Sequence, residues 1–110
     1  MRSDKERIED IIEAIEKIER YSGRGKQALE TDEMFQVWVT RHLQIIGEAA
    51  NLVSIEVQNR YPNIPWKKMI GMRHVLVHGY FEIDLELVWS VIENDIPQLK
   101  QQIQKLKMSL

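Results

Sequence analysis

The chain begins with a helical alternation of isoleucines and charged residues. Ser3 and Glu6 have the spacing of a capping box, which marks the start of a helix. The positions that follow are apolar at steps of three and four residues: Ile8, Ile11, Ile12, Ile15 and Ile18. We predict a first helix over residues 4–21, which ends before the turn signals Gly23 and Gly25.

A second, longer helix is predicted to begin at Thr31 or Asp32, either of which can cap it, and to run to about Asn59, before Tyr61 and Pro62. Two apolar stripes follow this helix, one through Phe35, Val39, Ile46, Ala49 and Val53, the other through Trp38, Ile45 and Leu52. More than one face should therefore be covered, and we expect a neighbouring subunit to cover part of it.

Two further helices complete the pattern. The third is predicted to start at Pro65 and to stop at Gly79. The fourth starts after the cap Asp84, and Pro97 should kink it or split it. Since no period-two alternation is present, no strand is expected. The sequence predicts one all-α domain over residues 1–110, an antiparallel bundle of four to five helices.

Composition narrows the chemistry. The chain has 110 residues and no cysteine, so disulfides, thiolate zinc sites and cysteine nucleophiles are excluded. No run approaches the roughly 20 apolar residues of a membrane span. The first residues are too charged for a signal peptide. We expect a cytoplasmic protein that does not associate with membranes.

Charge is unevenly distributed along the chain. The formal net charge is -2, but residues 57–81 contain no Asp or Glu and carry Arg60, Lys67, Lys68 and Arg73. Such a local basic segment can contact phosphate groups even in an acidic molecule, because salt limits the reach of each charge. The alternative is a short loop that lacks acids by chance.

Several familiar enzyme sites are excluded by spacing. None of the three histidines, His42, His74 and His78, follows a glutamate by three positions, so no di-iron bundle site is present. The zincin motif, the Gly-x-Ser-x-Gly motif and the phosphate-binding glycine loops are also missing. His74 and His78 could bind one metal ion from one helix face, but no third ligand is evident. We predict no metal and no cofactor.

Arg73 and His78 form the most promising pair. On a continuous helix they would lie about 140° apart around the axis, so they converge only where the helix ends. Gly79 indicates such an end, and a histidine at a helix C-terminus favours its protonated form. An imidazolium beside a guanidinium suits a phosphate. The alternative for His78 is a histidine that merely caps the helix.

The octapeptide from Arg73 to Tyr80 reads R-x-x-x-x-H-x-Y. It resembles the signature of HepT toxins in the HEPN superfamily of metal-independent ribonucleases. The R-H-L-Q-I-I-G-E-A-A block at residues 41–50 and the Y-P-N-I-P-W turn also look typical, so that the resemblance covers residues 4–107. It implies a HEPN-like homodimer, whose two motifs face each other across a cleft and cut RNA, with transfer RNA the favoured target.

The resemblance also implies residue roles. Arg73 would hold the scissile phosphate and His78 would move a proton, leaving a 2′,3′-cyclic phosphate. His74 would assist in the cleft, and Glu48 would orient Arg73 or His74. Small residues beside Glu48 would let another helix come close to it. The alternative for both His74 and Glu48 is an ordinary surface residue.

Tyr80 is the regulatory part of the resemblance. In HepT–MntA pairs a minimal nucleotidyltransferase antitoxin adds AMP to the motif tyrosine, which implies that Tyr80 is the modification site and that AMP there blocks RNA. Alternatively, Tyr80 only packs over the helix end. Lys67, Lys68 and Arg60 are the candidate RNA contacts.

Two functions from different classes remain. The first is a toxin ribonuclease neutralised by an MntA-like partner. The second is a noncatalytic helical module that only docks a nucleotidyltransferase. Replacing His78 by alanine separates them, because a docking module would keep its partner and would have no toxicity to lose.

Overall fold

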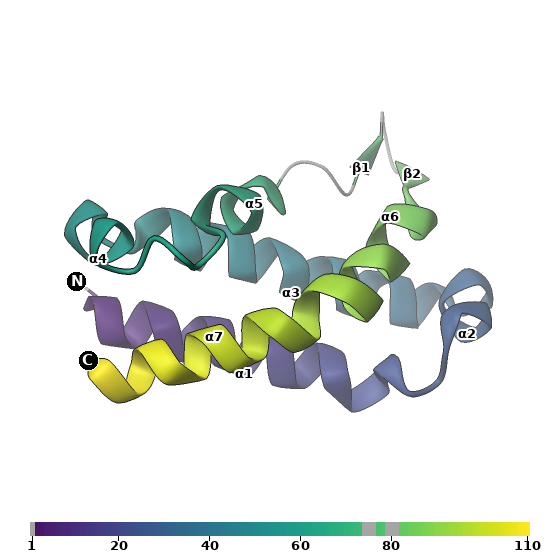
Figure 1. Cartoon of the computed structure of the whole chain (residues 1–110). Coiled ribbons are helices and arrows are strands. Elements are labelled where there is room, and N and C mark those ends of the chain that lie inside the picture. Colours follow the sequence, from purple (N-terminus) through teal and green to yellow (C-terminus); the bar gives the residue numbers. More distant parts are fainter. Residues whose placement is uncertain (1, 74–76, 79–81) are drawn as a thin grey trace.

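Helix α1 (Asp4–Ser22) and helix α3 (Glu33–Leu52) pack antiparallel along most of their length, and helix α7 (Ile96–Ser109) packs against α1 (Figure 1). This arrangement comes from a computed structural model that describes residues 2–73, 77–78 and 82–110. Isoleucines of α1 are fully buried between the helices, together with apolar residues of α3 and α7: Ile8, Ile11, Ile15, Ile18, Val39, Leu43, Ile46 and Ile103. The predicted all-α bundle is confirmed.

Three predicted helix starts are confirmed by their caps. Ser3 and Glu6 form the reciprocal capping box of α1. The Asp32 side chain accepts hydrogen bonds from the first backbone amides of α3. Asp84 caps helix α6 (Leu85–Ser90) in the same way. Each cap satisfies amides that have no partner inside the helix.

The predicted second helix is wrong in its extent. It ends at Leu52, and a separate helix, α4 (Ile55–Arg60), follows. The break is fixed by Ser54, whose backbone N and Oγ donate to the carboxylate of Asp4 at 2.8 and 2.7 Å. A short helix that the pattern did not indicate, α2 (Lys26–Thr31), precedes α3. It follows Gly25, whose φ of 89° favours glycine.

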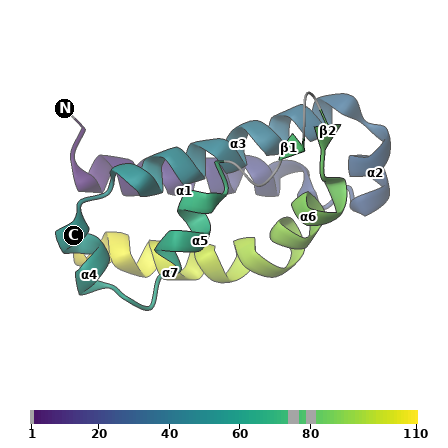
Figure 2. The same cartoon turned by 90° about the horizontal axis from the view of Figure 1, so that it is seen from above.

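The predicted third helix is also wrong in its extent. Helix α5 (Trp66–Gly71) lies on top of the bundle next to α3 and ends eight residues before Gly79 (Figures 1 and 2). Beyond it, strand β1 (Val77–His78) pairs antiparallel with strand β2 (Glu82–Ile83). The expectation of no strand therefore fails over this short pair, where β-branched Val77 and Ile83 are register partners.

The predicted kink or split at Pro97 takes the form of a change in helical hydrogen bonding, in a helical run that continues from Leu85 to Ser109. A π-helical segment, η1 (Val91–Asp95), joins α6 to α7. In it the backbone N–H of Ile96 donates to Val91, five residues earlier, instead of four. Proline has no N–H and cannot continue the normal pattern, which explains the change of helical register before Pro97. Of the helices that the structure describes, none has the length and apolar character needed to cross a membrane.

Candidate active site

One face of α3 is left uncovered by the rest of the described chain. Its residues follow each other at steps of three and four positions: Met34, Val37, Arg41, Gln44, Glu48 and Leu52. We call this set the exposed α3 stripe. Its ends are apolar, with Met34 77%, Val37 55% and Leu52 51% exposed, whereas its middle is polar.

Gly47 lies in α3 beside this stripe and allows the chain after α5 to come close. A Cβ at Gly47 would lie 2.6 Å from Cγ and 2.8 Å from the backbone N of Arg73, and 3.1 Å from the carbonyl oxygen of Met69. Carbon atoms do not normally approach backbone so closely. Glycine is therefore required for Arg73 to lie against α3, as the small residues around Glu48 had suggested.

The Arg73 side chain is held on two sides. Its Nη1 lies 4.0 Å from Oε1 of Glu48, and its side chain is 25% exposed whereas that of Glu48 is 62% exposed. Its Nε is buried and has no hydrogen-bond partner among the described residues. Among the described residues, Arg73 is therefore placed by packing on Gly47 and by one long ion pair with Glu48.

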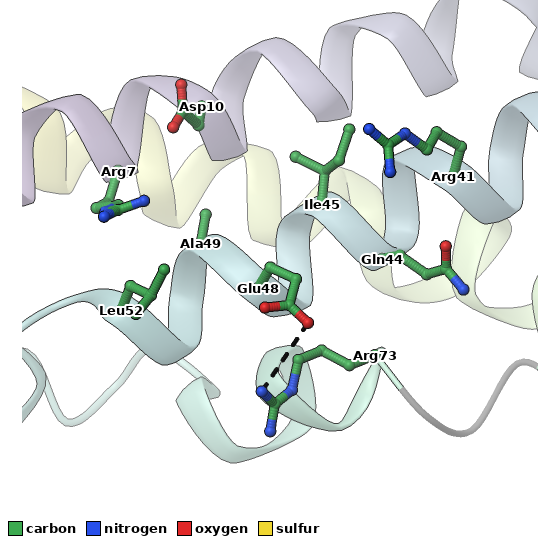
Figure 3. Close-up of a pocket in the computed structure, with 9 residues that line it drawn as sticks. All are labelled: Arg7, Asp10, Arg41, Gln44, Ile45, Glu48, Ala49, Leu52 and Arg73. Carbon is green, nitrogen blue, oxygen red and sulfur yellow. Dashed lines mark ion pairs between the residues drawn. The ribbon is translucent and has the colours of Figure 1, made fainter. Parts of the chain in front are cut away.

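Arg73 and Glu48 lie at a pocket of about 510 Å³ between α1, α3 and the segment after α5. Figure 3 shows the side chains that surround it: Arg7 and Asp10 from α1, Arg41, Gln44, Ile45, Glu48, Ala49 and Leu52 from α3, and Arg73. We call this the arginine pocket. Three guanidinium groups and two carboxylates surround it, so an anion is its natural ligand.

A second hollow continues the arginine pocket toward the strand pair. It has a volume of about 460 Å³, and it shares Arg41 and Gln44 with the arginine pocket. At its other side lies Ile83 of β2, the strand that pairs with the His78-bearing strand β1. One continuous surface thus connects Arg73 with the strand pair that contains His78.

The interpretation of His78 as a histidine at a helix C-terminus is wrong. His78 lies in β1, seven residues beyond the last residue of α5, and not at the end of that helix. Its backbone is paired in register with Glu82. His74 and Tyr80 lie outside the described residues, so their predicted roles, and the two-histidine metal alternative, stay predictions.

The basic residues predicted to contact RNA do not gather at the arginine pocket. Nζ of Lys68 forms an ion pair of 2.6 Å with Asp95. Lys67 is exposed on α5, and Arg60 is exposed at the end of α4. None of the three lines the arginine pocket.

Sequence reasoning missed Arg7 and Arg41. Arg41 belongs to the 41–50 block and lies seven residues before Glu48, hence two turns away on one helix face, so this spacing could have pointed to it. Arg7 gave no such signal. It was one of many charges on the polar face of the first helix, and only the packing of α1 against α3 brings it to the pocket.

His42, which had no predicted role, is buried on the inner side of α3. Its side chain is 6% exposed, and its ring meets the edge of Trp38 with centroids 4.6 Å apart. Its Nδ1 has no hydrogen-bond partner among the described residues. Burial lowers the pKa of His42 below its usual value, and the charge of Lys17 adds to this effect.

The fold and the site together define an all-helical protein with an arginine-lined pocket suited to anions. The sequence model of the family described as "Ribonuclease HepT-like" matches residues 11–106. The chain therefore belongs to the HepT-like ribonuclease family.

Relatives of similar length agree. The chain is 39% identical over 107 residues to "Probable ribonuclease HepT" of Thermococcus cleftensis, covering 96% of this chain and 97% of the relative. It is 31% identical over 107 residues to "Putative RNase TTE0752" of Caldanaerobacter subterraneus subsp. tengcongensis, covering 96% of each. A third relative, "Putative RNase MJ1380" of Methanocaldococcus jannaschii, is 38% identical over 73 residues, or 66% of this chain and 67% of the relative. No solved structure matches the chain significantly.

Proposed function

We propose that this chain is the toxin of a toxin–antitoxin pair: a metal-independent endoribonuclease that acts in the cytoplasm, with transfer RNA as its favoured target. Membership of a ribonuclease family gives the substrate class. The observation that carries the proposal is the close approach of Arg73 to Gly47, which fixes its guanidinium at the arginine pocket. Arg73 is also the first residue of the R-x-x-x-x-H motif.

In the proposed reaction Arg73 binds the scissile phosphate and offsets the negative charge that grows in the transition state. His78 accepts the proton of the neighbouring 2′-hydroxyl. The 2′-oxygen then bonds to phosphorus, and the bond from phosphorus to the 5′-oxygen breaks. The leaving oxygen takes a proton from a protonated histidine, for which His74 is the candidate. The products are a 2′,3′-cyclic phosphate and a 5′-hydroxyl.

Glu48 is proposed to orient Arg73 from α3. Its long ion pair of 4.0 Å and its exposed carboxylate are suited to holding a direction without cancelling the arginine's charge. Lys67, Lys68 and Arg60 stay predicted contacts for more distant parts of the RNA.

A homodimer is part of the proposal. The exposed α3 stripe supports it, because apolar Met34 and Val37 lie at one end and apolar Leu52 lies at the other. Contact between two copies through these ends would cover apolar surface on both sides of the polar middle. The two arginine pockets would then face the same cleft.

Regulation is proposed to act at Tyr80, through transfer of AMP by an MntA-like nucleotidyltransferase. A bulky anionic nucleotide two residues from His78 would repel RNA. The intact mass of the protein, expressed alone and together with an MntA-like nucleotidyltransferase, tests this. We expect added AMP that disappears in Tyr80→Phe. An unchanged mass would remove Tyr80 as the modified residue.

The docking-module alternative is tested in cells. Expression of the wild type without its partner should stop growth, and expression of His78→Ala should not, while both proteins should co-purify with the nucleotidyltransferase. If the wild type does not affect growth but still binds the partner, the docking module is the better interpretation.

A further inference from the structure

Arg7 and Arg41 line the arginine pocket together with Arg73, but the reaction proposed above uses neither of them. They come from different helices, and in Figure 3 they lie on opposite sides of Glu48 and Ala49. We infer that Arg7 and Arg41 bind further phosphodiester groups, one on each side, of the RNA strand whose scissile phosphate lies at Arg73. This inference rests on the proposed function and extends its binding site onto α1 and α3.

The charges around the arginine pocket are not balanced within the described chain. Neither Arg7 nor Arg41 forms an ion pair with any described residue, although both line one pocket. The acids of the pocket are engaged with other cations: Asp10 pairs with Arg2, and Glu48 pairs with Arg73. Two permanently charged groups thus face the pocket with no neutralising partner in the described chain. A phosphodiester supplies that charge.

Two arginines at the pocket have a buried Nε. Nε of Arg7 is buried and has no hydrogen-bond partner among the described residues, as is also true of Arg73. A buried Nε is itself out of reach of a ligand, so the terminal Nη groups of these arginines are the donors that can meet one at the pocket. Each non-bridging oxygen of a phosphodiester can accept hydrogen bonds from a guanidinium.

The separation of Arg41 and Arg73 along α3 is comparable to the spacing of phosphates in a strand. Arg41 precedes Gly47, where Arg73 contacts α3, by six residues, which corresponds to about 9 Å along a helix. Phosphates of a stacked strand follow each other at about 3.4 Å per nucleotide along the axis. A strand anchored at Arg73 therefore presents another phosphate to Arg41 within about three nucleotides. Gln44 lies between these positions and is shared by both hollows.

The test measures how RNA binding depends on salt. The probe is a fluorescein-labelled single-stranded RNA of about 12 nucleotides with every 2′-hydroxyl methylated, so that the proposed reaction cannot cut it. Fluorescence anisotropy gives the association constant between about 50 and 200 mM KCl. The slope of log K against log salt is negative, and each lost phosphate contact makes it less steep by about 0.7. We expect this loss in Arg7→Gln and in Arg41→Gln, and about twice this loss in the double variant.

Lys105→Gln is the matched control. Lys105 is exposed on α7 and has no ion pair among the described residues, so its loss removes one charge without touching the pocket. Its slope should equal that of the wild type. If Arg7→Gln fails to fold because its Nε is buried, Arg41→Gln, at an exposed position, decides the question alone.

Two outcomes overturn the inference. One is an unchanged slope in Arg41→Gln. The other is a less steep slope accompanied by an altered oligomeric state on size-exclusion chromatography, which would mean that the arginines bind carboxylates of a second copy and affect RNA only through assembly. Cleavage of unmethylated RNA by the wild type is measured separately, so a failure of the proposed ribonuclease reaction is distinguishable from a failure of these phosphate contacts.

Discussion

The inner and the outer face of α3 differ in burial and in charge. The inner face, with Val39, Leu43 and Ile46, is completely buried against the other helices. The outer face carries the exposed α3 stripe, whose polar middle opens onto the arginine pocket. The inner face holds its neighbours by apolar burial, whereas the outer face keeps charged groups without full pairing. Apolar packing and the proposed chemistry therefore lie on opposite sides of one helix.

Gly47 connects the two faces. It is buried, as the inner positions are, but it determines where an arginine of the outer pocket lies. The difference between the faces therefore predicts three kinds of mutational effect. Inner-face changes should alter stability, outer-face changes should alter activity, and a change at Gly47 should affect activity through geometry.

The largest effect is expected from paired leucine truncations on the two faces. Leu43→Ala should lower the free energy of unfolding by about 2–5 kcal/mol, because Leu43 is fully buried and a cavity would remain. Leu52→Ala, at a position 51% exposed in the single chain, should change the free energy of unfolding of the monomer by less than about 1 kcal/mol. Urea unfolding followed by circular dichroism measures both. Equal losses would contradict the division between the faces.

Gly47→Ala should reduce RNA cleavage by about 100-fold, because the new Cβ displaces Arg73 and small misplacements of catalytic groups are costly. Stability should change by no more than about 2 kcal/mol, since alanine's better helix propensity offsets part of the clash. Single-turnover cleavage and thermal melting give the two values. Gly23→Ala, where a Cβ meets no atom within 4 Å, should leave cleavage unchanged.

His42 should make stability depend on pH. Its pKa in the folded protein lies below 6.5, mainly because of burial, so the unfolded chain takes up the proton first as the pH falls. The contribution of His42 is fully present above about pH 7.5 and is lost as the pH falls through 6.5 and below. The slope from one proton cannot exceed about 1.4 kcal/mol per pH unit.

His42→Leu tests this assignment. Urea unfolding at a series of pH values should show a smaller loss of stability toward acid in the variant than in the wild type, while the other two histidines are common to both proteins. Identical pH profiles would show that His42 has the same pKa in both states.

The smallest effect is expected at Glu48. Glu48→Gln should change the free energy of unfolding by less than about 1 kcal/mol, because the pair with Arg73 is long and exposed. Cleavage should nevertheless fall several-fold, since the direction of Arg73 is then less fixed. Glu48→Asp, which keeps the charge, should recover part of the rate. Full activity in Glu48→Gln would remove the proposed orienting role.

The parts of the fold that could be predicted depend on local sequence. Ser3, Asp32 and Asp84 cap their helices through atoms two or three residues away, so the pattern contains the whole signal. The break after α3 could not be predicted in the same way. It depends on Asp4, which is 50 residues from Ser54 in sequence, while the apolar periodicity continues across the break.

The candidate site, too, was predictable only where it depends on local sequence. The motif identified Arg73, and the small residues of the 41–50 block indicated a close approach that the structure has at Gly47. The prediction that His78 lies at a helix end is wrong, because α5 ends at Gly71 and does not extend to Gly79. Arg7 was missed because its neighbours in space come from another helix.

The most direct test of the account is cleavage of transfer RNA by the purified wild type in excess EDTA, with analysis of the product ends by mass spectrometry. The account predicts cleavage that is unaffected by EDTA, fragments ending in 2′,3′-cyclic phosphate, and no cleavage by Arg73→Gln or His78→Ala. Loss of cleavage in EDTA and its return with zinc would contradict a reaction carried out by Arg73 and His78 without a metal.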